Sequence, residues 1–103
     1  MAKDWTDEVG RARAALTVAA LRSTLLTYKE LGVAIGMSGI ELRNALPRVL
    51  DVLSEQCNER TEPSLAALVV NGDTGKPGAG WSDGVRPWHT EVRRVFDHYG
   101  SWQ

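Results

Sequence analysis

Residues 27–41 read Thr-Tyr-Lys-Glu-Leu-Gly-Val-Ala-Ile-Gly-Met-Ser-Gly-Ile-Glu, and this stretch decides the fold that we expect. Thr27 and Glu30 have the spacing of a capping box, in which each side chain accepts a backbone N–H at the start of a helix. Gly36 stands where a residue in the left-handed conformation would end that short helix. The stretch therefore predicts a helix that begins after Thr27 and ends at Gly36.

A second helix is expected to begin almost immediately, because Ser38 and Glu41 repeat the capping-box spacing. Its apolar residues keep to one face throughout: Leu42, Ala45, Leu46, Val49, Leu50, Leu53 and Cys57. Pro47 lies inside this helix and predicts a kink or a break there. Two helices with so short a connection form a helix-turn-helix, which we place at about residues 27–59.

The rest of the chain predicts further elements around this motif. An N-terminal helix is expected over residues 4–24, where apolar residues recur at helical spacing. An apolar run that ends in two valines precedes a glycine-rich turn, so we expect a β-hairpin "wing" over about residues 64–81. Pro87 begins a last helix over about residues 87–99. The sequence thus predicts one domain, residues 1–103, that is mainly α with a small β-hairpin: a winged helix-turn-helix with extra N- and C-terminal helices.

Several pieces of the chain, taken in order, resemble known proteins: Thr27-Tyr28-Lys29-Glu30-Leu31, Ile35-Gly36, Ala45-Leu46, Leu68-Val69-Val70-Asn71-Gly72-Asp73 and Pro77-Gly78-Ala79-Gly80-Trp81. The order resembles the winged-helix DNA-binding domain of the alkylguanine-DNA alkyltransferases and the alkyltransferase-like proteins. It is also similar to a family of small uncharacterised bacterial and phage proteins. The resemblance covers residues 27–81, and it implies a winged-helix architecture that binds DNA.

The resemblance does not extend to the repair chemistry of the alkyltransferases. Where those proteins have their acceptor cysteine, this chain has Pro63-Ser64-Leu65, without a thiol or an adjacent histidine. The position of the arginine that they intercalate into DNA is near Ile40 here. The resemblance therefore implies the architecture without methyl transfer and without an arginine that flips bases.

Composition and charge place further limits on the function. With 43% hydrophobic and 24% charged residues, the chain has the composition of an ordinary globular protein. The single cysteine forms no internal disulfide, the apolar runs are too short to cross a bilayer, and the acidic N-terminus is unlike a signal peptide, so we expect a cytoplasmic protein without a membrane partner. His89 and His98 point in different directions on the last helix, so we expect no metal, no cofactor and no enzymatic activity.

DNA binding would depend on a local patch, because the formal net charge is only −1. Residues 22–48 carry a net positive charge, whereas residues 51–62 carry a net negative charge. Arg43, Asn44 and Arg48 should face outward from the second helix, and these are side chains that read guanine and adenine in the major groove. Together with residues at the two helix starts and in the wing, the expected DNA-binding set is Lys29, Ser38, Arg43, Asn44, Arg48, Thr74 and Lys76.

The sequence leaves two functions open. The first is a non-enzymatic DNA-binding module, such as a phage-type regulator or accessory factor, whose partner is double-stranded DNA. A homodimer is plausible for it, because one small domain makes few phosphate contacts. The alternative is a protein-binding adaptor or inhibitor on the same fold, which the acidic run Asp51, Glu55, Glu59 and Glu62 favours. A small-molecule sensor is a third alternative, for which no polar cluster is visible in the sequence.

Overall fold

Helices make up most of the protein, of which the computed structural model describes residues 5–76 and 87–100. The elements follow in the order α1 (Thr6–Leu21), β1 (Leu26–Thr27), α2 (Tyr28–Ile35), α3 (Gly39–Glu59), a 3-10 helix η1 (Leu65–Leu68), β2 (Val69–Val70) and α4 (Trp88–Gly100). Residues 36–38 alone connect α2 to α3. The mainly helical prediction is therefore confirmed, and the expected pair of consecutive helices is present.

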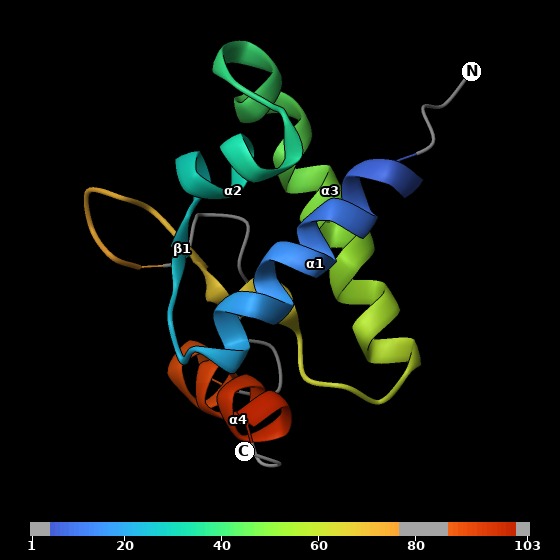
Figure 1. The fold of residues 1–103 in the computed structure, drawn as a ribbon, viewed down its shortest axis with the longest axis vertical. Helices are drawn as coiled ribbons and strands as arrows, with labels where there is room; N and C mark the ends of the chain where they lie inside the picture. The colour runs from blue at the N-terminus through green and yellow to red at the C-terminus, as the bar shows by residue number, and fades with distance from the viewer. Residues whose placement is uncertain (1–4, 77–86, 101–103) are drawn as a thin grey trace.

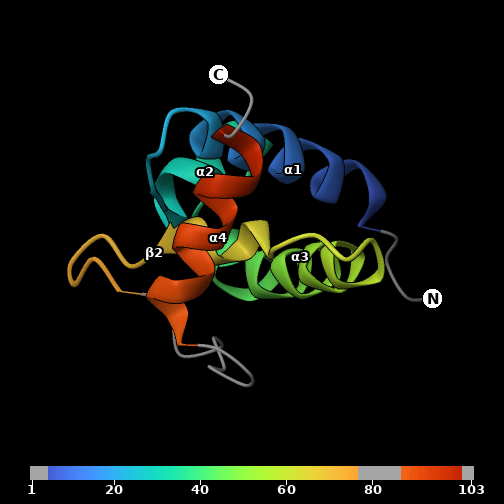
Figure 2. The same ribbon diagram turned by 90° about the horizontal axis from the view of Figure 1, so that it is seen from below.

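Helix α1 lies at the centre of the packing and contacts α2, α3, α4 and η1 (Figure 1). Alanines on its inner side, Ala12, Ala19 and Ala20, are buried and leave room for the neighbouring helices. η1 fills the space between α1, α3 and α4, and α4 lies across it, as Figure 2 shows from below. The core is built from the apolar stripes of these elements: Val9, Leu16, Leu31, Ile35, Leu46, Val49, Leu53, Leu65, Leu68 and Val95.

The start and the end of α2 follow the local sequence. The Glu30 backbone N–H donates to the Thr27 hydroxyl at 3.0 Å, and the Thr27 backbone N–H donates to the Glu30 carboxylate at 2.9 Å. This is the predicted capping box. Gly36 ends the helix with φ of 82°, in the left-handed region that a residue with a side chain rarely adopts. Both ends of α2 are therefore fixed by residues that are neighbours in sequence.

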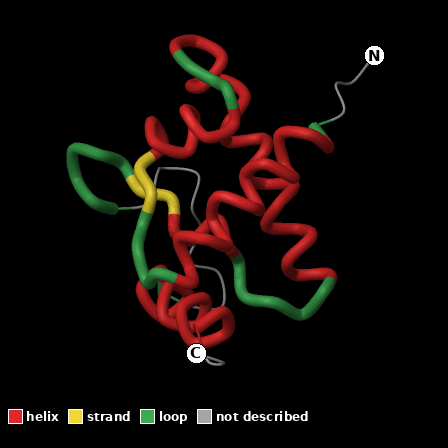
Figure 3. Tube along the Cα trace, viewed as in Figure 1, coloured by secondary structure: helices red, strands yellow, loops and turns green. Residues whose placement is uncertain are grey.

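The sheet differs from the predicted hairpin. β1 and β2 pair in parallel, with Leu26 opposite Val69 and Thr27 opposite Val70 (Figure 3). Residues 65–68, expected in the first strand of the wing, form η1 instead. The wing predicted over residues 64–81 is therefore wrong in its first strand, and its returning strand, around residues 79–81, lies outside the described residues. The local pattern identified an apolar segment but not its partner, which lies before α2 in the chain.

The last helix attaches to the core through its first residue. The Trp88 indole N–H donates to the carbonyl of Ala67 in η1 at 2.7 Å. A buried indole N–H usually finds such an acceptor, because leaving it unpaired is costly. The bond holds the start of α4 against η1, and the helix runs within one residue of the bounds predicted for it.

Candidate nucleic-acid interface

Besides Gly39, with which α3 begins, the first half of α3 presents six exposed residues on the side away from the core: Ile40, Glu41, Arg43, Asn44, Pro47 and Arg48. We call these residues the α3 face. They are exposed because Leu46, Val49 and Leu50, on the opposite side of the helix, are buried against the rest of the fold. The orientation of Arg43, Asn44 and Arg48 expected from the apolar stripe is therefore present.

The polar side chains of the α3 face are available to a partner. Among the described residues, neither Arg43 nor Arg48 forms an ion pair, and Asn44 donates no side-chain hydrogen bond. The Arg48–Asp51 pair that helical spacing allows is likewise not formed. Their guanidinium and amide groups are held by a helix that is anchored in the core, so an incoming ligand meets side chains on a fixed backbone.

Pro47 lies inside α3, and the helix continues through it from Gly39 to Glu59 without a break. Because proline has no N–H, the Arg43 carbonyl has no donor in the next turn. This group lies on the exposed side of the helix, where water can bind it. The same stripe continues beyond Arg48 to Asp51 and Glu55, which are also exposed. The α3 face therefore carries two arginines together with the Glu41 carboxylate, and it is followed by two further carboxylates.

Ser38 is exposed at the start of α3, as predicted, but it does not cap the helix. Its side chain makes no capping hydrogen bond, so the second capping box expected with Glu41 is wrong. The helix begins instead with Gly39 at φ of 61°, in the left-handed region that glycine adopts without steric cost. The Ser38 hydroxyl therefore takes no part in capping α3.

The remaining predicted residues, Lys29, Thr74 and Lys76, form a second group. All three are exposed. The pairing of β1 with β2 carries the turn of residues 71–76 to the start of α2, and a Cβ placed on Gly72 would lie 3.6 Å from Thr27 Cγ2. We call residues 71–76 the β2 turn.

The β2 turn is ordered by hydrogen bonds within itself. The Asn71 backbone N–H donates to the Lys76 carbonyl at 2.7 Å, and the Gly75 N–H donates to the Asn71 carbonyl at 2.8 Å. The Thr74 hydroxyl accepts the Lys76 backbone N–H at 3.2 Å, which leaves the hydroxyl proton free to donate. Thr74 and Lys76 are thus exposed on a turn whose backbone is fixed by hydrogen bonds.

The two groups lie at opposite ends of α2. Figure 1 shows the β2 turn beside β1, where α2 begins, and the start of α3 beyond the end of α2. Lys29 therefore lies in the first turn of α2 and Thr74 and Lys76 in the β2 turn, whereas Arg43, Asn44 and Arg48 lie on the first half of α3. The short helix α2 is the spacer between the two groups.

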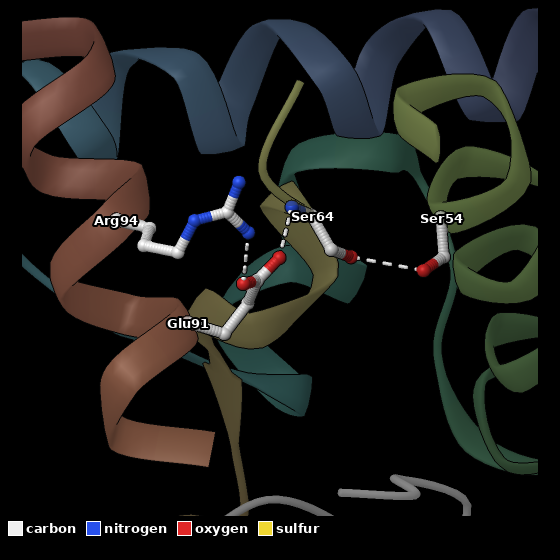
Figure 4. A network of polar contacts seen from close by, with 4 residues as sticks. All are labelled: Ser54, Ser64, Glu91 and Arg94. Atoms are coloured by element: carbon white, nitrogen blue, oxygen red, sulfur yellow. Dashed lines mark hydrogen bonds and ion pairs between the residues drawn. The ribbon is translucent and has the colours of Figure 1, made fainter. Parts of the chain in front are cut away.

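A buried carboxylate on α4 was not expected from the sequence. Glu91 is 8% exposed, and its carboxylate accepts the Ser64 backbone N–H at 2.8 Å and an Arg94 N–H at 2.6 Å (Figure 4). The Ser64 hydroxyl bonds the Ser54 hydroxyl at 2.9 Å rather than this carboxylate. The network links α4 to α3 through Ser64, the residue before η1. Its hydrogen bonds hold these elements together, which is a structural role. The burial of Glu91 could have been predicted from helical periodicity, because Glu91 lies one turn before the buried Val95.

A second polar cluster joins α1 to the end of α3. The Arg13 guanidinium donates to the Gln56 side-chain oxygen at 2.9 Å and lies 3.8 Å from Glu62 Oε1. That oxygen is buried and accepts no hydrogen bond, so the ion pair is its only compensation among the described residues. Burial raises the pKa of the nearby Tyr99 above 10.0, and the negative charge of Glu62 raises it further.

The chain has no detectable similarity to a known protein family, a curated protein or a solved structure that would indicate its function. No protein-family model matches the chain, and no similar protein was found among curated proteins or among solved structures. Within residues 5–76 and 87–100, no three His, Cys, Asp or Glu side chains are grouped to hold a metal ion. In the same residues, no helix is both long and apolar enough to span a membrane.

Proposed function

We propose that this chain is a non-enzymatic module that binds double-stranded DNA through a helix-turn-helix formed by α2 and α3. The observation that carries the proposal is the α3 face, where Arg43, Asn44 and Arg48 are exposed on the first half of the helix and neither arginine has an ion-pair partner among the described residues. Arginine donates two hydrogen bonds to guanine, and asparagine bonds adenine in the same bidentate way. The start of α3 would enter the major groove.

The dimensions of the α3 face fit this mode of binding. With its side chains, an α-helix is about 10–12 Å across. The major groove is also about 12 Å wide. Asp51 and Glu55 lie beyond Arg48 on the same stripe and would repel phosphates. Only the first turns of α3 would therefore be inserted, with Glu41 as their one carboxylate, and the second half of the helix would remain outside the groove.

The second group of residues would contact the DNA backbone. Lys29 and Lys76 supply cations, and the Thr74 hydroxyl supplies a donor for a phosphate oxygen. The β2 turn would then occupy the place of the wing in the alkyltransferase-like domains that residues 27–81 resemble. Because one such module makes few phosphate contacts, two copies bound to adjacent half-sites would strengthen binding.

The test is a fluorescence anisotropy titration of the full chain against labelled random-sequence duplex DNA at two salt concentrations. We expect the dissociation constant to rise with salt, because each phosphate contact releases counterions. The double variant Arg43→Ala/Arg48→Ala should weaken binding and flatten the salt dependence by about one unit of slope for each phosphate that the variant no longer neutralises.

The matched control is Arg60→Ala/Arg93→Ala, which removes the same charge from two exposed positions outside the α3 face. It should retain most of the binding. Equal effects of the two double variants would contradict this docking mode, since binding would then depend on net charge alone. Absence of salt-dependent binding by the unmodified chain would contradict the proposed function itself.

A protein-binding module is the second candidate, and the exposed carboxylates on the second half of α3 favour it. Asp51, Glu55 and Glu59 form an acidic surface that suits a basic protein partner better than DNA. A purified complex that survives when Arg43 and Arg48 are replaced, but dissociates when Asp51 and Glu55 are changed to Asn and Gln, would decide for this candidate.

A further inference from the structure

We infer that Ile40 gives the α3 face a preference for A·T-containing duplexes, by contacting the C5 methyl group of thymine in the major groove. This inference rests on the DNA-binding function proposed above and names the base that the apolar part of the site would recognise. The observation behind it is the exposure of Ile40, which is 75% exposed in the first turn of α3.

Exposed apolar residues are common on proteins and need no explanation when they stand alone. The described residues include three other large exposed apolar side chains, Val18, Leu25 and Val33. Ile40 differs from them because Arg43 and Asn44 follow it on its own side of α3, one helical turn further on. Ile40 is therefore an apolar side chain on the same surface as Arg43 and Asn44, the exposed polar residues of the α3 face.

The ligand that fits such a mixed surface presents one apolar group among hydrogen-bonding groups. The major-groove edges of the bases meet this description, because the thymine methyl is the apolar group among their donors and acceptors. Ile40 and Asn44 are about 6 Å apart along the helix axis, at about 1.5 Å per residue. This is less than two base-pair steps of about 3.4 Å each. An isoleucine on thymine and an asparagine on adenine would thus read base pairs that are one or two steps apart.

The inference is tested with two duplexes of the same alternating A·T sequence, one with thymine and one with deoxyuridine at every thymine position. The two differ by the C5 methyl group. Anisotropy titrations of the full chain should give tighter binding to the thymine duplex, by about fourfold for one buried methyl. The variant Ile40→Ala should bind the two duplexes equally, and the exposed valine variant Val18→Ala should keep the difference.

Three outcomes overturn the inference, and they are distinct from one another. If the chain binds both duplexes equally while its affinity still depends on salt and on Arg48, the methyl contact is wrong and the proposed function stands. If a preference for thymine persists in Ile40→Ala, another residue makes the contact. If the chain binds neither duplex nor random-sequence DNA, the proposed function fails as well. A protein would then be the expected partner of the surface around Ile40.

Discussion

The Glu91 carboxylate accepts the backbone N–H of Ser64 at 2.8 Å, and this bond fixes α4 to the segment that leads into η1. The two residues belong to parts of the fold that meet only in three dimensions. Because Glu91 is buried and the bond is partly buried, its removal leaves a partly buried donor without this partner.

Replacing Glu91 with Ala should therefore lower the free energy of unfolding by about 1–3 kcal/mol. Urea denaturation followed by circular dichroism measures this change. The control is Asp97→Ala, at an exposed position on the same helix, which should change stability by no more than about 0.5 kcal/mol. If the two variants are equally stable, the bond between Glu91 and Ser64 does not hold α4 in place.

The same substitution should have opposite effects at two helical glycines. A Cβ on Gly32 would lie 2.5 Å from Leu42 Cδ1 and 2.9 Å from the Met37 carbonyl oxygen, which belongs to the backbone and cannot easily move. Gly32→Ala should destabilise the protein by about 1–3 kcal/mol, as overpacking typically does. A Cβ on Gly10 would meet nothing within 4 Å, so Gly10→Ala should stabilise α1 by about 0.5–1 kcal/mol. Thermal denaturation of both variants would show the two signs, and a stable Gly32→Ala would contradict the close approach of α2 and α3.

The start of α2 and the start of α3 should respond differently to removal of a hydroxyl. Thr27→Ala removes the acceptor for the Glu30 N–H and should cost about 1 kcal/mol, the usual effect of deleting such a cap. Ser38 makes no capping bond, so Ser38→Ala should cost much less. Chemical denaturation would compare the two, and an equal loss of stability would mean that Ser38 caps α3 in solution.

The raised pKa of Tyr99 should make the free energy of unfolding depend on pH in the alkaline range. Burial and the nearby charge of Glu62 raise its pKa above 10.0, so the folded protein holds the phenolic proton more tightly than the unfolded chain does. The resulting stabilisation is complete below pH 10 and is lost as the pH rises through the pKa of the folded state. Between about pH 9 and about pH 12, the free energy of unfolding should fall more steeply for the unmodified chain than for Tyr99→Phe. Parallel curves for the two proteins would show that Tyr99 ionises equally in the folded and unfolded states.

The sequence predicts the parts of this fold that are set by neighbouring residues. Thr27 and Glu30 satisfy each other's amides across one turn, and Gly36 supplies a left-handed residue, so both ends of α2 could be located. The apolar stripe of α3 likewise predicted which of its residues are exposed, including Arg43 and Asn44.

The parts that could not be predicted depend on partners distant in sequence. Val69 forms a strand because Leu26 lies beside it, and no local pattern identifies Leu26 as the partner. The charge of Glu91 favours a surface position, and its burial follows from the Ser64 N–H that it accepts. Ser38 has the spacing of a capping residue but makes no capping hydrogen bond, and α3 begins with Gly39 at a positive φ that the spacing does not reveal.

The parallel pairing of Leu26 with Val69 has a consequence for the folding reaction. The two residues enclose α2, α3 and η1 in one loop of chain, and closing a loop of that length costs conformational entropy that only the finished contacts offset. We therefore expect the strands to pair late, after the helices have formed, and to separate first when the protein unfolds. The β2 turn, which follows β2 directly, would move away from the start of α2 at that same early step of unfolding, while Arg43 and Arg48 remained on a folded α3.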